Sequence, residues 1–319
     1  MLRNRFVWLI VTCICVAGLF VAYYGFSNRH PEDVAPPQHT LQLSGPILRV
    51  QYDSVSNMIL IKSEKGITVI SAMTYEIVSE WQLENIVDYF IVENPAYRYV
   101  VVQNDGEVLC YDNQFKYVTQ FSLSVGQIST VDVRRDGTLV SAITGRQPST
   151  DLFVVDLIQH RIVLTRKGLG ASRSSFSGLE SLLVTRLGNG LLIYTIATDE
   201  SVTVDASFHY SYACIVNTGP NAWTVVPSTF PAVFTIANNT LVQHGHFDER
   251  FDIVTGDRDG VYIYTKPKEG TAYIKKVNGI SLVTLKTMTK TAPPAFCVCE
   301  PLKIIVLGHH TGRIEIYSY

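Results

Sequence analysis

Apolar and polar residues alternate along short segments of this chain, and the segments share one pattern. Each begins with a glycine at a turn and continues as an alternating run, as in residues 104–112. Glycine tolerates the positive φ of a tight turn, and a period of two is the signature of a β-strand. The pattern returns in residues 65–71, 189–195, 259–265 and 311–318, and in a looser copy that ends at 153–156.

The copies recur at a regular interval. Their last residues lie 41, 44, 39, 70 and 53 positions apart, and a further copy at 230–236 divides the interval of 70 into 41 and 29. A mean spacing of about 41 residues is typical of four-stranded propeller blades. The pattern therefore predicts an all-β fold with almost no helix, a seven-bladed β-propeller over residues 39–319, with six blades as the alternative.

The strands of three blades are predicted individually. We expect them at residues 47–52, 58–62, 67–71 and 75–83, at 87–93, 99–103, 108–112 and 117–123, and at 296–300, 304–308 and 313–318. The turn at 135–138 is expected to match the Gly66 turn in the third blade. Because the last blade lacks a fourth strand, we expect residues 39–43 to supply it and so close the ring, since an open ring exposes unpaired strand edges.

The first 38 residues have a different composition. Residues 6–28 carry no charge, and about 20 apolar residues suffice to span a bilayer as a helix. We expect a transmembrane signal anchor here, after a tail at residues 1–5 and before a proline-rich stalk at 29–38; a cleaved secretory signal is the alternative. Arg3 and Arg5 precede the segment, so the positive-inside rule places the propeller on the non-cytosolic side.

The turn glycine, the alternating strand and the Tyr111-Asp112 dipeptide resemble the WD-repeat β-propellers over roughly residues 39–319. Val155-Asp156 is a weaker copy of the dipeptide, and Gly45-Pro46 and Gly126-Gln127 stand where that family has Gly-His. The resemblance implies a rigid platform for protein–protein contact, usually without catalysis.

Composition removes some alternatives. The net charge of −2 offers no global basic field for nucleic acid, and charged residues make up only 17% of the chain. Four cysteines in a domain of this size do not form a disulfide framework, so we expect them to be buried hydrophobes; they are Cys110, Cys214, Cys297 and Cys299.

Candidate chemistry is sparse. An open metal site could combine His244, His246, Asp248 and His309, but histidine pairs are common in loops, so we expect neither a metal nor a cofactor. The glycine- and serine-rich residues 168–178 lack the Lys-Ser/Thr of a P-loop, so we expect a connecting loop there. Asn238 begins a glycosylation triplet that matters only in a secretory compartment.

Charge is segregated along the chain. Acidic residues gather at 76–93 and lysines at 266–290, and the two groups would form a bipolar docking face on neighbouring or near-neighbouring blades. Residues 287–294 are expected to form a loop that leaves the ring. The predicted interaction residues are Glu76, Glu80, Glu84, Lys266, Lys268, Lys275, Lys276, Lys286 and Lys290.

Three hypotheses about function follow. The first is a membrane-anchored, non-catalytic scaffold with protein partners, an accessory subunit of a membrane complex in the secretory pathway or the mitochondrial inner membrane. The second is a ligand- or metal-binding receptor or enzyme that uses the propeller channel. The third is a cytosol-facing adaptor or exchange factor for a small GTPase.

Overall fold

The computed structural model describes residues 36–319 except for short segments at 179–180, 187–189, 206–212, 220–221, 228–231, 238–239, 248–250, 258–259, 266–270, 279–280, 290–292 and 294. The predicted membrane anchor at residues 6–28 and nearly all of the stalk lie outside this part. No helix within the described residues is long and apolar enough to cross a membrane.

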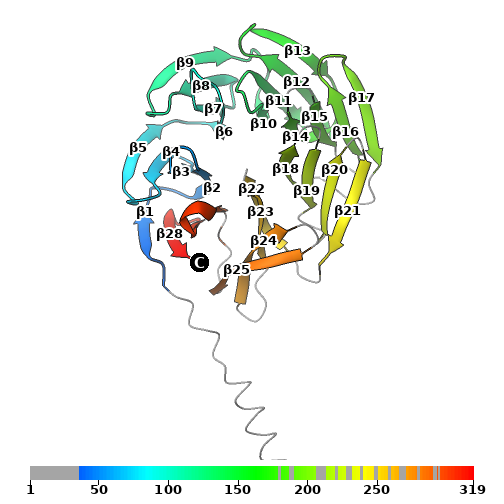
Figure 1. Cartoon of the computed structure of the whole chain (residues 1–319). Coiled ribbons are helices and arrows are strands. Elements are labelled where there is room, and N and C mark those ends of the chain that lie inside the picture. Colours follow the sequence, from blue (N-terminus) through cyan, green and yellow to red (C-terminus); the bar gives the residue numbers. More distant parts are fainter. Residues whose placement is uncertain are drawn as a thin grey trace, which may run out of the picture. The chain divides into compact units, whose positions relative to one another are not determined.

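The described chain forms seven antiparallel four-stranded sheets that follow one another around a ring (Figure 1). The first blade contains β2 (Ile47–Asp53), β3 (Met58–Ser63), β4 (Gly66–Ser71) and β5 (Ile77–Gln82). The second contains β6 (Ile86–Ile91), β7 (Tyr99–Gln103), β8 (Glu107–Tyr111) and β9 (Tyr117–Ser122). The third contains β10 (Ile128–Val133), β11 (Leu139–Arg146), β12 (Ser149–Asp156) and β13 (Arg161–Arg166).

The remaining blades repeat this order from the channel outward. The fourth contains β14 (Ala171–Ser177), β15 (Ser181–Arg186), β16 (Gly190–Thr195) and β17 (Glu200–Asp205). The fifth contains β18 (Ala213–Gly219), β19 (Ala222–Pro227), β20 (Ala232–Ala237) and β21 (Thr240–His246). The sixth contains β22 (Phe251–Asp257), β23 (Gly260–Thr265), β24 (Thr271–Asn278) and β25 (Ser281–Thr289).

The seventh blade joins the two ends of the propeller sequence. It contains β26 (Ala295–Cys299), β27 (Ile304–Gly308), β28 (Arg313–Ser318) and, as its outer strand, β1 (His39–Gln42). β1 pairs with β28 in the register His39↔Ile316, and the Leu43 amide donates to the Gly312 carbonyl at 2.9 Å. The predicted closure of the ring is confirmed, as is the seven-bladed all-β architecture. The single helical segment of the described chain is the 3₁₀ turn η1 (Glu300–Leu302).

The residue at the end of the recurrent strand has a local role that explains its chemistry. Oγ of Ser71 accepts the amide of Met73 at 3.2 Å, and Oδ1 of Asp112 accepts that of Gln114 at 2.8 Å. Oδ1 of Asp156 accepts the amide of Ile158 at 2.9 Å. A short polar side chain at this position therefore stabilises the turn that leads into the outer strand.

The blade assignment of the copy at 259–265 was wrong. This segment is β23, the second strand of the sixth blade, whereas the other copies are third strands. Both kinds of strand alternate and both can follow a glycine turn, so the pattern alone does not distinguish them. With β24 as the third strand, the third strands end at intervals of 39 to 45 residues around the whole ring.

Three local expectations also need correction. Residues 135–138 connect the first and second strands of the third blade, so they do not match the Gly66 turn. Residues 171–177 form the inner strand β14 instead of a loop, because its backbone pairs with β15 while its serines stand beside a polar channel. Residues 287–289 belong to β25, where Thr287 pairs with Tyr273.

Apolar side chains pack between consecutive blades. One cluster joins the last blade to the first through Ile47, Ile59, Val306 and Ile316, each fully buried. Gly308 lets these blades approach closely, because a Cβ added there would lie 2.4 Å from Cγ2 of Ile47. Cys110, Cys297 and Cys299 are buried and form no disulfide, as the sequence predicts, whereas the side chain of Cys214 lies outside what the structure describes.

Candidate functional site

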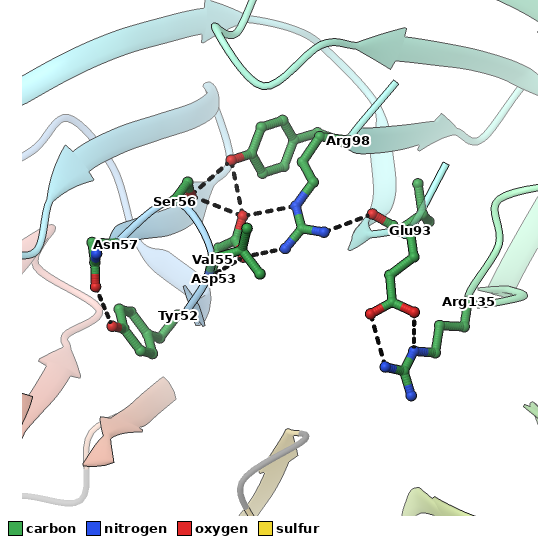
Figure 2. A network of polar contacts seen from close by, with 10 residues as sticks. Tyr52, Asp53, Val55, Ser56, Asn57, Glu93, Arg98 and Arg135 are labelled. Carbon is green, nitrogen blue, oxygen red and sulfur yellow. Dashed lines mark hydrogen bonds and ion pairs between the residues drawn. The ribbon is translucent and has the colours of Figure 1, made fainter. Parts of the chain in front are cut away.

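A buried polar network joins the first two blades on the face where β2 ends (Figure 2). Asp53 ends β2, and Arg98 immediately precedes β7. Nε of Arg98 donates to Oδ2 of Asp53 at 3.0 Å, and a second guanidinium nitrogen donates to Oδ1. Oδ2 also accepts the hydroxyls of Ser56 at 2.8 Å and Tyr99 at 3.1 Å, while Oδ1 accepts the Val55 amide at 3.1 Å. The aspartate is therefore fully engaged.

The electrostatics of this network follow from its burial. The side chains of Asp53 and Arg98 are 2% and 14% exposed. Burial opposes ionisation of Asp53, but the hydrogen bonds from Arg98 and Ser56 outweigh it and hold the pKa of the carboxyl below its usual value. All of its oxygens are committed to the protein, so this network stabilises the blade 1–blade 2 contact and has no free atom for chemistry.

A second, exposed pair extends the connection to the third blade. Glu93 and Arg135 form two parallel hydrogen bonds, at 2.6 and 2.7 Å (Figure 2). Their side chains are 41% and 65% exposed. Three consecutive blades are thus linked by polar contacts on one face. Removing one partner of the buried pair should cost more stability than removing one partner of the solvated pair, because it leaves a buried charge without its counter-ion.

The central channel holds a cavity with a volume of about 510 Å³. The inner strands of all seven blades line it. The wall formed by β6, β10 and β14 is polar and charged, and it includes Asp88, Ser129, Thr130, Asp132, Arg173 and Ser174. The wall formed by β18, β22 and β26 has mostly apolar residues, among them Ile215, Val216, Ile253 and Val254. Phe296 on β26 is only 1% exposed, because its ring packs in a core cluster with Tyr264. The channel is therefore amphipathic.

One pair of charges in the channel is mutually neutralised. Arg49 on β2 contacts Oδ2 of Asp88 on β6 at 2.5 Å and donates to the Tyr89 carbonyl at 3.1 Å. Its guanidinium also lies 4.9 Å from the centre of the Tyr89 ring. Burial favours loss of the Arg49 proton, but the charge of Asp88 more than offsets this and raises the pKa of Arg49 above its usual value.

Asp132 is in a different situation. Its Oδ2 accepts the amide of Phe176 on the neighbouring blade at 2.7 Å, but it forms no ion pair in the part of the chain that the structure describes. Burial raises the pKa of Asp132 to about 7, although the hydrogen bonds from the backbone amides of Phe176 and Val133 and the more distant charge of Arg49 act to lower it. A half-buried carboxyl with a perturbed pKa, facing a cavity, marks a candidate functional site.

The predicted histidines lie elsewhere. His244 is on the outer strand β21, where its Nε2 lies 2.5 Å from Oγ1 of Thr235. His309 follows β27 in the seventh blade and contacts Glu315 at 3.0 Å. Neither lines the channel. Asp248 and the side chain of His246 are outside the described residues, as is Asn238, and no group of three metal-ligating side chains occurs in the described part.

The predicted docking charges separate into two kinds. Glu76, Glu80 and Glu84 are exposed along the outer edge of the first blade. Lys276 instead contacts Glu300 at 2.5 Å, and Nζ of Lys286 donates to the Ser318 carbonyl at 2.9 Å, so both link the sixth blade to the seventh. Lys275 is 9% exposed. Lys266, Lys268 and Lys290 fall outside the described residues.

The charged residues that line the channel were not predicted from the sequence. Asp132 and Arg173 lie in the separate strands β10 and β14, and no spacing in the sequence links them. The one available signal was their position relative to the repeat, since each lies in the first strand of a blade and inner strands line the channel of a propeller.

Comparison with known proteins supports the fold but does not identify a family or a function. No protein-family model matches the chain, and no curated protein matches it by sequence. Among solved structures it is similar to the β-propeller domain of Cps50 (Swd1) from Myceliophteria thermophila, with a TM-score of 0.66 at 14% identity, over 89% of this chain and 99% of that one. The chain has a WD-repeat-like propeller fold. At this identity the likeness concerns architecture alone, and propellers serve many functions.

Proposed function

We propose that this protein is a membrane-anchored, non-catalytic scaffold whose propeller holds protein partners as an accessory subunit of a membrane complex. The observation that carries the proposal is the place of β1, which closes the ring by pairing with β28. The predicted anchor at residues 6–28 precedes β1 by only the ten-residue stalk. Ten extended residues span at most roughly 35 Å, so such an anchor would hold the seventh blade near the bilayer.

The propeller suits a scaffold because its shape is rigid and its outer edges are accessible. We place the docking surface on the acidic edge, defined as Glu76, Glu80 and Glu84 with the neighbouring Ile77 and Val78. The two apolar side chains are 49% and 48% exposed. Exposed apolar side chains rimmed by charges of one sign fit a partner with complementary basic residues, and those charges would orient the partner more than they set its affinity.

Purification of the tagged full-length protein in mild detergent tests this proposal. We expect a large particle that contains other membrane subunits in fixed proportion. A variant with Glu76, Glu80 and Glu84 changed to lysine should lose them, whereas the matched variant with Glu64, Asp105 and Glu200 changed to lysine should keep them. A particle no larger than the protein and its micelle would contradict the proposal.

The proposed location has the propeller on the non-cytosolic side, in the secretory lumen, outside the cell, or in the mitochondrial intermembrane space. Protease treatment of sealed vesicles tests it. We expect the propeller to be protected until the membrane is permeabilised. Digestion in intact vesicles would instead favour a cytosol-facing adaptor.

A further inference from the structure

Asp132 on β10 is a carboxylate of the channel wall that has no counter-ion in the described part of the chain. Asp88, which also lines the cavity, is paired with Arg49. Asp132 accepts hydrogen bonds from two backbone amides, those of Phe176 and Val133. A carboxylate has about four acceptor positions, so Asp132 can accept a further donor from the cavity. A donor that also carries a positive charge would form the stronger bond.

Hydroxyl groups lie beside Asp132 at the seam between the third and fourth blades. Asp132 and Thr130 are two residues apart on β10, so their side chains lie on one face of the strand. Oγ1 of Thr130 donates to the Ser172 carbonyl of β14 at 3.3 Å. Oγ of Ser141 donates to the Asp132 carbonyl at 3.4 Å and lies 2.8 Å from Oγ of Ser174. Thr130 and Ser174 both line the cavity, so their oxygens can accept the other N–H bonds of an ammonium paired with Asp132.

The two guanidinium groups that line the cavity do not take the place of such a cation. Arg49 is engaged by Asp88 at 2.5 Å. Arg173 precedes Phe176, whose amide binds Asp132, by three residues, which corresponds to roughly 10 Å along a strand. Asp132 forms no ion pair with either guanidinium, although the structure describes all three side chains. The carboxylate is therefore available to a cationic ligand.

The opposite wall indicates an apolar group on that ligand. Four half-buried aliphatic residues line the cavity there, Ile215 and Val216 on β18 and Ile253 and Val254 on β22. The volume of about 510 Å³ lies within the range of small-molecule sites, about 300–1,000 Å³. Removal of apolar surface from water is favourable, so a cation with a hydrocarbon chain should bind more tightly than a bare ammonium.

We infer that the central channel binds a small organic cation, a primary amine with an apolar chain. Its ammonium pairs with Asp132 and donates to the hydroxyls of Thr130 and Ser174, and its chain extends toward β18 and β22. This site is separate from the acidic edge, so the inference goes beyond the scaffold function and does not depend on it.

The protonation of Asp132 gives the site a pH dependence. Burial raises the pKa of Asp132 to about 7, with Arg49 on β2 acting to lower it and Asp88 on β6 to raise it. The other charged residues on the strands packed against β10 are Arg173 on β14 and Arg146 at the end of β11. An alkylammonium stays protonated from pH 6 to pH 8, because its pKa lies near 10. The ionised fraction of Asp132 falls about tenfold from pH 8 to pH 6, so the affinity for the amine should be about tenfold weaker at pH 6.

Calorimetric titration of the full-length protein in mild detergent, with the heats of micelles alone subtracted, tests the inference with four probes. Hexylamine carries the charge and the chain, 1-hexanol lacks the charge, hexanoate reverses it, and methylamine lacks the chain. We expect hexylamine to bind at least about tenfold more tightly than each of the others at pH 8. Absence of hexylamine binding at millimolar concentration would overturn the inference, as would an affinity equal to that of 1-hexanol or of methylamine.

One substitution assigns the charge. Asp132→Asn keeps the size of the side chain and an acceptor for the Phe176 amide, and it should lower the affinity for hexylamine to that for 1-hexanol. The exposed control Asp105→Asn should leave both affinities unchanged. Retention by Asp132→Asn of the preference for hexylamine would refute the role of Asp132, and its folding is checked independently by the unfolding temperature. In the wild type, equal affinities for hexylamine at pH 6 and pH 8 would refute the same role without any substitution.

Discussion

The contact between the first two blades should depend strongly on Asp53. Asp53→Ala removes the acceptor for Arg98, Ser56 and Tyr99 at once and leaves a guanidinium that is only 14% exposed without its counter-ion. Breaking a buried ion pair by removing one partner costs about 3–5 kcal/mol. For a domain of this size, that loss lowers the unfolding temperature by about 5–8 °C.

Thermal unfolding of the full-length protein in mild detergent, followed by tryptophan fluorescence, measures the effect. Trp81 reports on the same interface, because its ring stacks on Tyr111 at 4.1 Å. The control is Arg135→Ala, which breaks the exposed pair with Glu93 and should cost at most about 1 kcal/mol. Equal losses in the two variants would refute the reasoning that burial decides the contribution.

The pH dependence of this network has a definite sign. The pKa of Asp53 is below its usual value in the folded protein, since the bonds from Arg98 and Ser56 outweigh the effect of burial. The stabilisation is therefore present above about pH 4, where the unfolded carboxyl is ionised, and is lost as the pH falls further. The stability difference between wild type and Asp53→Ala should shrink in that acidic range.

Three further outcomes are expected. The pKa of Asp132 is raised from 3.8 to about 7 in the folded protein, so the contribution of this carboxyl to stability falls as the pH rises from about 4 to 7. Over that range the stability of Asp132→Asn, measured by urea unfolding, should rise on the order of 4 kcal/mol relative to wild type. A difference that does not change with pH would contradict this. Gly308→Ala places a Cβ 2.4 Å from Ile47 and should cost about 1–3 kcal/mol in thermal unfolding, whereas Gly126→Ala, with nothing within 4 Å, should cost less than about 0.5 kcal/mol. Deleting residues 39–42 uncovers the edge of β28 and should produce oligomers in size-exclusion chromatography, and deleting stalk residues 33–36 should not.

The periodic features of the fold could be predicted from the sequence because each blade repeats the same local requirements. Gly66 and Gly106 occupy turns with φ of +143° and +96°, and the strand after each one alternates. The pairing of β1 with the last blade could be predicted because every blade needs four strands and the last blade supplies only three from its own segment. The copy at 259–265 misled because the Gly260 turn has the same chemistry but joins an earlier pair of strands.

The channel and the polar network were beyond such reasoning. β14 is rich in serine and lacks an apolar face, since one side of an inner strand meets the channel; its pairing is visible only in three dimensions. Asp53 and Arg98 are 45 residues apart, about one repeat, and nothing in the local pattern of either residue shows that they meet. Contacts between blades depend on the geometry of the ring, which the sequence of one blade does not contain.

The closure of the ring by β1 sets an order for folding during synthesis. β1 leaves the ribosome with the first blade, but its partner β28 follows all the strands of the first six blades. Until β28 has been synthesised, β1 lacks the strand with which it pairs, and six blades must remain as an open arc. Pairings between such distant segments are slow to form and expose unpaired edges meanwhile. The nascent protein is therefore most vulnerable to aggregation, and most dependent on chaperones, in the interval before β28 emerges.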